Sequence, residues 1–432
     1  MKLLTLLVAL VVPALAQDPV AYIPRLEHNL RDNIVAFWYP KSIDRVNGGY
    51  IISADANGVA NPRASKTLVT QARQVWLFSR LAREGVRSKE MLEAAAHGFH
   101  FLHDKMWDQR YGGFYWEVDA TGTKALKPGK HMYGQSFALY ALSEYFEASK
   151  DPAALDLATR LFALFEQHAH DARYGGYLES FNRDWSAPPP GEPGYMEVPP
   201  DMKLMNTHLH LLESMTAYFR ASHSPVARDR LIELIAIQSN AVVRKPLTAC
   251  TDKYDRDWTP ALGRNPAWDR VSYGHDLENI WLLTDAAQAA GIPVEPFLDL
   301  FRQLFAYSLK YGYDPAHGGF YDSGPFSQPA TNRTKTWWVQ AEASVSALYM
   351  YRLTHDRAYW DVFAKTCDFI DRYQTDWQTG EWWESVSEDL KPSGAKAHGW
   401  KAGYHTGRAM LECLRILREI RVGQDSSPAA GL

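Results

Sequence analysis

The stretch Tyr111-Gly112-Gly113-Phe114 decides the fold, because related stretches recur along the whole chain. The first glycines of successive copies are 64, 63, 143 and 62 residues apart, so the long step spans two periods. One copy has therefore lost its glycines, and we expect it near residues 252–258. A fixed period of this kind predicts a repeat architecture, here with six repeats. The other copies are Asn47-Gly48-Gly49-Tyr50, Tyr174-Gly175-Gly176-Tyr177, His317-Gly318-Gly319-Phe320 and, more loosely, Gly380-Glu381-Trp382-Trp383.

Each repeat contains the same succession of elements. An alternating aromatic stretch such as residues 113–119 predicts a short hairpin, in which the glycines supply the positive φ of a tight turn. The first helix that follows, for example over residues 135–142 or 209–215, is apolar around most of its circumference and is expected to be buried. The second helix, for example over residues 156–165 or 296–309, keeps one polar face. Six repeats therefore predict twelve helices.

We expect these helices to form an all-α (α/α)6 toroid, an inner ring of six inside an outer ring of six, with short β-hairpins at one end. The repeat runs through residues 17–422 without a linker, which predicts one domain followed by a disordered tail over residues 423–432. An open helical array is the alternative. Such an array would favour atypical capping repeats at both ends, and neither end has this character.

The N-terminus has the pattern of an export signal. Met1-Lys2 precedes an apolar run over residues 3–12, and Ala14-Leu15-Ala16 offers a small-residue cleavage site. The apolar run is too short to span a bilayer as an ordinary helix. We expect residues 1–16 to be removed and the mature protein to be periplasmic or secreted.

Composition argues against several classes of partner. The net charge is only −4 with both signs interspersed, so nothing indicates nucleic acid, and no membrane association is expected. The three cysteines, Cys250, Cys367 and Cys413, are widely spaced and form no cluster suited to zinc. Aromatic residues make up 13% of the chain, including 15 tryptophans, and this surplus suits stacking on sugar rings. We expect a monomer that binds a small sugar.

Polar residues collect at the starts of the first helices. These starts occupy equivalent places in a closed ring, so their side chains converge on one mouth, as at a small-molecule site. The six openings are Gln71-Ala72-Arg73, Met132-Tyr133-Gly134-Gln135, Asn206-Thr207-His208-Leu209-His210, Gly274-His275-Asp276-Leu277-Glu278, Trp337-Trp338-Val339-Gln340-Ala341-Glu342 and Trp400-Lys401-Ala402-Gly403-Tyr404-His405.

Three of the six openings carry histidine. His208 and His210 are about 200° apart around a helix, so only one of them can face the mouth. His210 is preferred, because Asn206 lies one turn before it on the same face. His275 and Glu278 share a face at i, i+3, which would let the carboxylate orient the imidazole.

Two imidazoles that face each other across a cavity suit proton transfer to and from opposite faces of one carbon. His405 forms an i, i+3 pair with Arg408, which is read as either a site feature or a structural ion pair. A glycoside hydrolase would instead need two carboxylates astride a bond. The acids at helix starts are Glu278, Glu342 and Asp276, the last of which is expected to bind backbone N–H groups. A hydrolase and a non-catalytic sugar-binding protein remain alternatives.

Four segments carry a resemblance: residues 206–213, 272–278, 340–343 and 399–409. Together they resemble the N-acylglucosamine 2-epimerase superfamily and, within it, the cellobiose 2-epimerases. The Asn-Thr-His-Leu-His and Tyr-Gly-His-Asp motifs are specific, and the resemblance covers nearly the whole mature chain. It implies an (α/α)6 barrel, no metal or other cofactor, and reversible epimerisation at C2 that interconverts glucose- and mannose-configured reducing ends of a β-linked disaccharide.

The resemblance also implies roles for individual residues. His275 and His405 match the acid and base on either face of C2, and His210 matches a third histidine that assists ring opening. Arg73 matches the arginine that holds the developing enediolate oxygen. The other matches are Tyr133, Asn206 and Glu278, which contact substrate or orient histidine, and Trp400, Trp337 and Trp338, which correspond to aromatic residues near the distal sugar.

The chain departs from the family pattern in three places. Gln71 stands where Asn is usual, Ala402-Gly403 stands where Cys-Pro is usual, and an export signal is present. The sugar therefore stays open among cellobiose, mannobiose, lactose and an N-acyl monosaccharide. An N-acylhexosamine epimerase or an aldose–ketose isomerase of the same superfamily is a further alternative.

Overall fold

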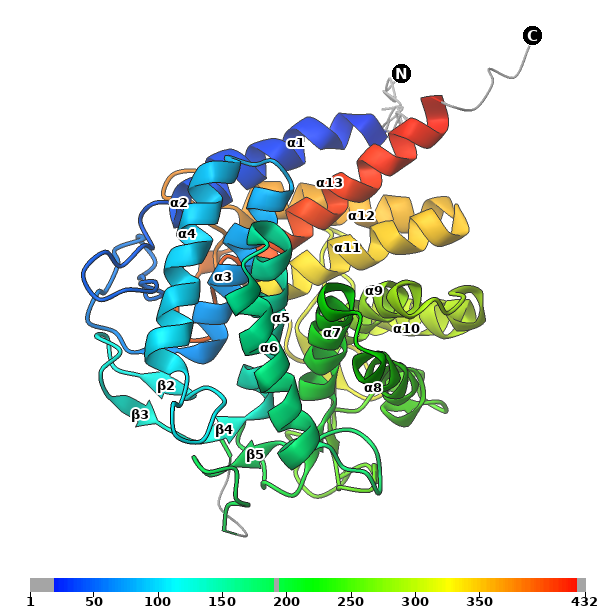
Figure 1. Ribbon diagram of the computed structural model, residues 1–432. Coiled ribbons are helices and arrows are strands. Elements are labelled where there is room, and N and C mark those ends of the chain that lie inside the picture. The colour runs from blue at the N-terminus through cyan, green and yellow to red at the C-terminus, as the bar shows by residue number, and fades with distance from the viewer. Residues whose placement is uncertain (1–18, 190–193, 426–432) are drawn as a thin grey trace, which may run out of the picture.

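Two concentric rings of helices make up the protein (Figure 1). The computed structural model describes residues 19–189 and 194–425. Each inner helix contacts the next, and the last contacts the first, so the ring is closed. The inner helices are α3 (Leu68–Arg83), α5 (Met132–Ser149), α7 (Met205–Ser222), α9 (Tyr273–Ala290), α11 (Trp337–Thr354) and α13 (Tyr404–Asp425). The (α/α)6 toroid expected from the repeat is confirmed.

The outer ring also has six members. Five of them are α4 (Ser88–Phe101), α6 (Pro152–Leu164), α8 (Pro225–Ala236), α10 (Leu298–Gly312) and α12 (Arg357–Phe369). The sixth is the N-terminal segment, in which α1 (Tyr22–His28) and α2 (Ala36–Trp38) are joined by a π-helical stretch, Asn29–Val35. Similar π-helical stretches end four other outer helices, at Leu102–Met106, Phe165–Ala169, Ile237–Ala241 and Ile370–Gln374. Short 3₁₀ turns cover Pro19–Ala21 and Glu295–Phe297.

The N-terminal segment closes the outer ring against the C-terminal part of the chain. Helix α1 lies beside α13 in Figure 1, and the two are in contact. Arg25 donates from Nη2 to Asp371 on the far end of the sequence at 2.7 Å, and the Trp38 indole donates to Glu381. Segments about 350 residues apart are therefore packed together, which an open array would not require.

Short antiparallel strands tie neighbouring repeats together at the mouth. The strand before an inner helix pairs with the strand after the next repeat's turn, and the bridge between Ala54 and Ala397 closes this circle. The ties are β1 (Lys66–Thr67) with β2 (Glu117–Val118), β4 (Lys130–His131) with β5 (Ser180–Phe181), β6 (Lys203–Leu204) with β9 (Lys253–Tyr254), β10 (Arg270–Ser272) with β11 (Ser323–Pro325) and β12 (Lys335–Thr336) with β13 (Ser385–Val386). The remaining pairings join β2 to β3 (Ala125–Lys127), β13 to β14 (Pro392–Ser393) and β7 (Val243–Arg244) to β8 (Ala249–Cys250).

The second glycine of each Gly-Gly turn is needed because an inner-helix side chain passes beneath the turn. Gly49 has a φ of +66°, and a Cβ there would lie 2.6 Å from Gln71 Oε1. That oxygen accepts from the Tyr50 N–H at 2.8 Å, and Gln71 Nε2 donates to the Tyr50 carbonyl at 2.8 Å. Gln71 is thus a framework residue. The equivalent bonds join Gln135 to Phe114, His208 to Tyr177, Asp276 to Cys250 and Gln340 to Phe320.

This bonding pattern corrects the position of the repeat copy that lost its glycines. Asp276 accepts from the backbone N–H of Cys250, so the lost turn lies in the β7–β8 hairpin rather than at residues 252–258. Thr248 keeps the positive φ of that turn, at 53°. The expectation that Asp276 binds backbone N–H is confirmed, although its partner belongs to this hairpin and not to its own helix.

A buried Lys–Asp ion pair recurs beside the turns and was not predicted. In the fifth repeat, Lys335 Nζ lies 2.8 Å from Asp314 Oδ2 and 2.6 Å from the Gly318 carbonyl oxygen. The lysine thereby holds the turn against the start of the inner helix. The corresponding pairs are Lys66–Asp44, Lys130–Asp108, Lys203–Asp171 and Lys396–Asp376.

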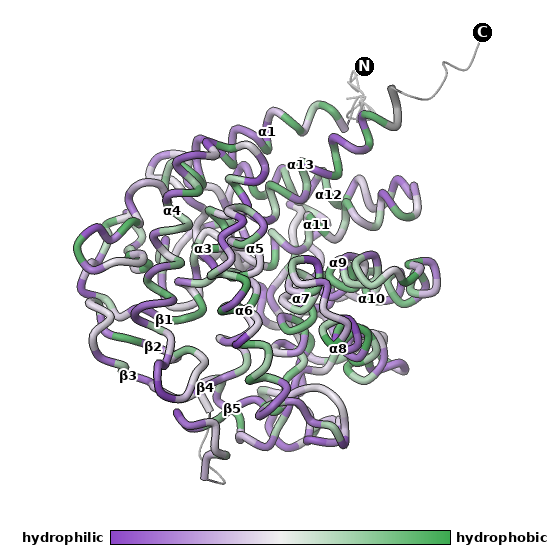
Figure 2. Tube along the Cα trace, viewed as in Figure 1, coloured by the Kyte–Doolittle hydropathy of each residue, from purple (hydrophilic) through white to green (hydrophobic). Residues whose placement is uncertain are grey.

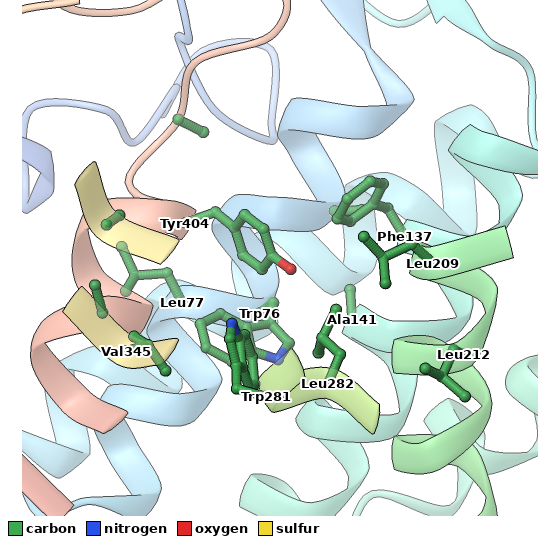
Figure 3. Packing of buried hydrophobic residues seen from close by; sticks show 14 of the residues in the cluster. Trp76, Leu77, Phe137, Ala141, Leu209, Leu212, Trp281, Leu282, Val345 and Tyr404 are labelled. Carbon is green, nitrogen blue, oxygen red and sulfur yellow. The ribbon is translucent and has the colours of Figure 1, made fainter. Parts of the chain in front are cut away.

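Aromatic and aliphatic side chains from the inner ring fill its centre. Figure 3 shows Trp76, Phe137, Leu209, Trp281 and Tyr404, which come from five different inner helices, converging on one core. Outer helices such as α4 and α8 mix hydrophilic and hydrophobic residues along their length (Figure 2), as expected for helices with one solvated face. This core supports the floor of the mouth.

Two of the predictions, a signal peptide and a disordered tail, concern the ends of the chain. The predicted signal peptide, residues 1–16, lies outside the described residues. Helix α13 continues to Asp425, three residues into the predicted disordered tail, and residues 426–432 are not described. In the described part of the chain, no helix combines the length and apolar character needed to cross a bilayer. The three cysteines are buried as free thiols.

Candidate active site

A cavity of about 170 Å³ opens where the inner helices begin. Its walls bring together residues that are up to 332 positions apart in sequence. The lining consists of Arg73, Tyr133, Asn206, His210, His275, Glu278, Trp337, Trp338, Trp400 and His405. All ten site residues predicted from the sequence therefore surround one cavity.

The helix geometry gives this cavity a positive field. Tyr133, Asn206, His275 and His405 all lie within the first turn of their inner helices. The N-terminus of a helix carries the positive end of its dipole. The first N–H groups of five inner helices are already paired at the mouth, as Met132 is with the Glu179 carbonyl and Met205 with the Asp252 carbonyl. The six helix ends therefore act on negative charge of a ligand through their dipoles and not as free donors.

The two histidines of α7 have different partners. His208 accepts from the Tyr177 N–H at Nε2 (2.9 Å), and its Nδ1 lies 2.7 Å from the Leu204 carbonyl, to which it donates. Both ring nitrogens are thus used by the framework. His210 lines the cavity, and its Nδ1 lies 3.0 Å from Glu213 Oε2. The choice of His210 as the histidine that faces the cavity agrees with the structure.

Arg73 reaches the cavity from α3 and is held by its neighbours. Its Nη1 donates to the Trp400 carbonyl at 2.8 Å, and its Nη2 donates to the Tyr133 hydroxyl at 3.1 Å. The guanidinium also lies over the Phe137 ring, with its carbon 4.2 Å from the ring centroid. This arrangement fixes a positive group at the wall of the cavity.

The partner of Glu278 differs from the one expected. The i, i+3 spacing predicted that Glu278 orients His275, but Glu278 Oε1 accepts from Arg408 Nη2 at 2.6 Å. The arginine belongs to α13, and its charged guanidinium binds the carboxyl group through one bond in place of the local imidazole. Burial lowers the pKa of His275, and the carboxylates whose charges oppose this effect are Asp252 and, more weakly, Asp322. The Trp338 ring lies 4.7 Å from the imidazole.

Burial keeps the cavity histidines neutral. Loss of hydration lowers the pKa of His275 to about 4 and that of His405 to about 3, despite the opposing charge of the carboxylates near them. The pKa of His210 is lowered for the same reason. A neutral imidazole has a free lone pair, so each of these rings is able to accept a proton at neutral pH.

Glu278 in the cavity wall and Glu342 behind it differ in how readily they ionise. Burial, reinforced by the nearby charge of Glu342, raises the pKa of Glu278 well above its ordinary value. Burial also disfavours ionisation of Glu342, but Arg408 and His405 outweigh it and bring its pKa to about 2. At neutral pH, Glu342 is therefore a carboxylate, while Glu278 is the harder of the two to ionise.

These groups also form a donor set that could suggest a metal. Ligand atoms of Glu278, Glu342 and His405 lie within 4.8 Å of one another. Arg408 Nη2, however, is 2.6 Å from Glu278 Oε1 and 2.7 Å from Glu342 Oε1. The guanidinium already supplies the positive charge between these carboxylates, so the set fits an arginine rather than a metal ion.

Three tryptophans border the cavity. The Trp338 ring lies between two of its histidines, 4.7 Å from the His275 ring and 6.0 Å from the His405 ring. Trp337 is buried, whereas Trp400 is 41% exposed at the rim and packs edge-on against Tyr133. Trp400 therefore offers an aromatic surface next to the opening.

Four functional groups were missed as site residues. Glu213, Glu342 and Arg408 contact side chains that line the cavity, namely His210, His405 and Glu278. The Trp281 indole donates to Glu342 Oε2 at 2.9 Å. An i, i+3 spacing links Glu213 to His210 and was a usable signal. The pairing of Glu342 with His405, from different helices, leaves no such local signal.

A comparison with protein families decides the assignment. The family model described as N-acylglucosamine 2-epimerase (GlcNAc 2-epimerase) matches residues 49–409, which is most of the chain. This chain belongs to the N-acylglucosamine 2-epimerase family. As a member of that family, the protein is a carbohydrate 2-epimerase and thus an isomerase.

Individual relatives of this epimerase agree over nearly their whole length. The cellobiose 2-epimerase of Bacteroides fragilis is 31% identical over 400 residues, which cover 90% of this chain and 97% of the relative. The solved cellobiose 2-epimerase of Spirochaeta thermophila is 34% identical, with a TM-score of 0.83, covering 93% of this chain and 98% of that one. The corresponding enzyme of Bacillus thermoamylovorans is 29% identical, with a TM-score of 0.84 and coverage of 92% and 99%.

Proposed function

We propose that this epimerase acts on a β-linked disaccharide of the cellobiose type and exchanges the configuration at C2 of its reducing end. The observation that carries the proposal is that His275 and His405 line one cavity together with Arg73. This combination supplies two proton-transfer groups and a fixed cation, which are what a proton abstraction next to a carbonyl needs.

The proposed reaction begins with the open-chain aldose. One imidazole removes the proton from C2, the electrons of the C–H bond form the C1–C2 double bond, and the negative charge moves to O1. Arg73 and the six helix N-termini stabilise this enediolate. Rotation about C2–C3 follows. The other histidine, protonated by water as the negative charge of the enediolate develops beside it, delivers that proton to the opposite face of C2, and the first imidazolium releases its proton to water. Proton return to C1 would give a ketose, so some isomerisation is an expected side reaction.

Unsatisfied polar atoms in the walls support a sugar as the ligand. Asn206 Oδ1, the Trp337 indole nitrogen and Glu278 Oε2 are buried without a hydrogen-bond partner among the described residues. All three residues line the cavity. Buried polar atoms without partners are costly, and the hydroxyl groups of a bound sugar would satisfy them. We assign these side chains to substrate binding, together with Tyr133, and assign ring opening to His210.

The size of the cavity favours a disaccharide that is only partly enclosed. Cavities for drug-sized ligands have volumes of about 300–1,000 Å³, and this one is smaller, at about 170 Å³. We propose that it encloses the reducing-end ring and that the second ring stacks on the exposed face of Trp400. An N-acyl monosaccharide would leave Trp400 without a contact.

The carboxylates of the site argue against a glycoside hydrolase. A hydrolase needs an acid and a base or nucleophile on opposite sides of the scissile bond. Here Glu213, Glu278 and Glu342 all bind the same guanidinium, that of Arg408. They therefore point toward one centre and not across a bond.

The direct test is proton NMR of the purified protein with cellobiose in D₂O. Deuterium at C2 together with a mannose-configured reducing end is the expected result. Release of free glucose would show that the protein is a glycoside hydrolase instead. If cellobiose stays unchanged, mannobiose and N-acetylglucosamine are the next substrates, and turnover of the latter alone would overturn the disaccharide assignment.

We also propose that the protein is exported and is cleaved after Ala16. The support is the charged, apolar and small-residue succession of residues 1–16. N-terminal sequencing of the protein from its host should give Gln17 as the first residue. An intact Met1 in the cytoplasmic fraction would contradict export.

A further inference from the structure

Arg408 occupies the centre of the inner ring, directly behind the catalytic cavity. Only 1% of its side chain is exposed. Its Nη1 donates to Glu213 and to the Tyr404 hydroxyl, and its Nη2 donates to Glu278 at 2.6 Å and to Glu342 at 2.7 Å. One guanidinium therefore binds carboxylates from α7, α9 and α11.

Two of these carboxylates, those of Glu213 and Glu342, also contact histidines that line the cavity. Glu213 accepts from Arg408 at Oε1, and its Oε2 lies 3.0 Å from His210 Nδ1. Glu342 Oε1 lies 2.7 Å from both Arg408 Nη2 and His405 Nδ1. Arg408 does not line the cavity itself, so its influence on the reaction must pass through these glutamates.

We propose that Arg408 is a positioning residue, which clamps Glu213 and Glu342 and thereby fixes His210 and His405 as Nδ1–H tautomers. Their Nε2 atoms are then left free to exchange protons with the substrate. This inference rests on the proposed function and deepens it, because it couples two histidines on different helices through a single side chain.

The charges of the buried groups around Arg408 support this positioning role. Three buried carboxylates around one cation would be strongly destabilising if all were ionised. The pKa of Glu278 is raised, whereas the pKa values of Glu213 and Glu342 are lowered by Arg408, so the two carboxylates that contact histidines are the ones most easily ionised beside this cation. Arg408 stays charged, because its pKa is raised well above the ordinary value by the three carboxylates in spite of burial.

The same cation acts on the histidines through space. Burial is the main cause of the low pKa of His210 and His405, and the like charges of Arg408 and Arg73 lower both values further. Removing Arg408 should therefore raise the pKa of both imidazoles. The titratable and charged groups around Arg408, its carboxylates and these two rings are Arg73, the carboxyl groups of Glu213, Glu278, Glu342 and Glu412, the rings of His210 and His275, and the hydroxyls of Tyr133, Tyr140 and Tyr404. Arg80 and Arg415 act on Glu412.

The residue used for a matched control variant lines a second cavity. This cavity measures about 460 Å³, opens at the other end of the ring and is lined by five arginines, Arg408 among them. Arg415 lies in this cavity on the same helix and binds Glu412 at 2.9 Å from Nη2. Its hydrogen bonds go to Glu412, Glu419 and Tyr349, and not to the three carboxylates that Arg408 binds. Arg415→Gln removes a partly buried ion pair of α13 and leaves the clamp intact.

The experiment compares Arg408→Gln, Arg408→Lys and Arg415→Gln with the unaltered protein. Two measurements are made: the pH profile of kcat/KM for epimerisation, and the tautomeric state of ¹⁵N-labelled histidines in the unliganded protein by NMR. For Arg408→Gln we expect kcat to fall by about 10²-fold or more with little change in KM. The acidic limb should move to higher pH as the pKa of His405 or His210 rises above that of His275. His210 and His405 should lose the pure Nδ1–H form.

Arg408→Lys keeps the charge but cannot bridge three carboxylates with one compact group. It should leave the acidic limb in place, lower kcat and disturb at least one histidine tautomer, which keeps the inference testable if Arg408→Gln fails to fold. Arg415→Gln should have the unaltered pH profile and tautomers. Unchanged histidine tautomers in both Arg408 variants would overturn the inference.

The two readouts separate this inference from the proposed function. If the unaltered protein turns over no sugar, the proposed function fails, but the NMR comparison still tests whether Arg408 controls the imidazoles. If turnover is present and the Arg408 variants lose activity only in proportion to their unfolded fraction, the clamp is structural and the inference fails while the function stands.

Discussion

The Nδ1 atom of His405 lies 2.7 Å from Glu342 Oε1, so a carboxylate on α11 holds an imidazole on α13. Replacing Glu342 with Gln removes the negative charge but keeps the shape. We expect kcat to fall by about 10²-fold, because an amide accepts more weakly and does not stabilise a protonated ring. Steady-state kinetics with cellobiose measure this effect. A kcat within a factor of two of the unaltered enzyme would contradict a role for Glu342 in holding His405.

His275 and His405 should each be essential for activity. His275→Ala and His405→Ala are each expected to lower kcat by about 10²–10⁴-fold, since each removes one proton-transfer group. Thermal unfolding should show that both variants still fold. His208→Ala is the contrasting variant, because His208 binds the Tyr177 backbone, and it should reduce stability more than it reduces the activity of the folded fraction. Full activity in a His275→Ala/His405→Ala double variant would end the assignment.

Activity should extend to acidic pH. The catalytic base must be neutral, and burial lowers the pKa of His275 to about 4, compared with an ordinary value of about 6.5. Because kcat/KM reports the unliganded enzyme, its acidic limb should lie near pH 4 and not near pH 6.5. A limb near pH 6.5 in buffers of constant ionic strength would show that these imidazoles are not buried as described.

Acid unfolding must be excluded in that experiment. The pKa of Asp314 is lowered to about 2 by Lys335 in spite of partial burial. A carboxyl group whose folded pKa is depressed stabilises the fold fully above its unfolded pKa of about 3.9, and this contribution is lost as pH falls toward 2. The ion pair is therefore still present near pH 4, and circular dichroism over the same range checks that the protein remains folded.

Trp400 should control the preference for two sugar rings. Its exposed face at the rim would contact the distal ring, and an aromatic contact contributes about 1 kcal/mol. Trp400→Ala should therefore raise KM for cellobiose several-fold, with a smaller effect on kcat. Mannose, which lacks a distal ring, is the comparison substrate. An equal loss of kcat/KM for both sugars would assign Trp400 to the enclosed ring instead.

The buried Lys–Asp pairs should be the main polar support of the turns. Lys335→Met removes the buried cation that pairs with Asp314, leaving the carboxylate with only the partly exposed His317 ring and backbone N–H groups, and should cost about 3 kcal/mol of unfolding free energy. Lys391→Met, at an exposed position, should change stability by less than about 0.5 kcal/mol. Urea unfolding measures both. A Lys335→Met/Asp314→Leu double variant should recover part of the loss, because no uncompensated charge stays buried.

Much of the site could be predicted because repeat equivalence and helical periodicity are local properties. Residues at the same place in each repeat must meet in a closed ring, so Arg73, His210, His275 and His405 could be placed at one mouth without coordinates. The choice of His210 over His208 followed from the angle between successive helix positions. The lost repeat copy was misplaced, because without its glycines only the bond from Cys250 to Asp276 marks it.

The amino-acid sequence by itself determined the six-fold repeat, the two rings of helices and the residues that face the mouth. Only the tertiary structure decided how those residues are held. Arg408 is 195 positions from Glu213 and 130 from Glu278, and no periodicity relates them. Which carboxylate binds which cation depends on the relative position of whole helices and on the loss of hydration in the interior. For this reason Glu278 pairs with a distant arginine and not with the histidine one turn away.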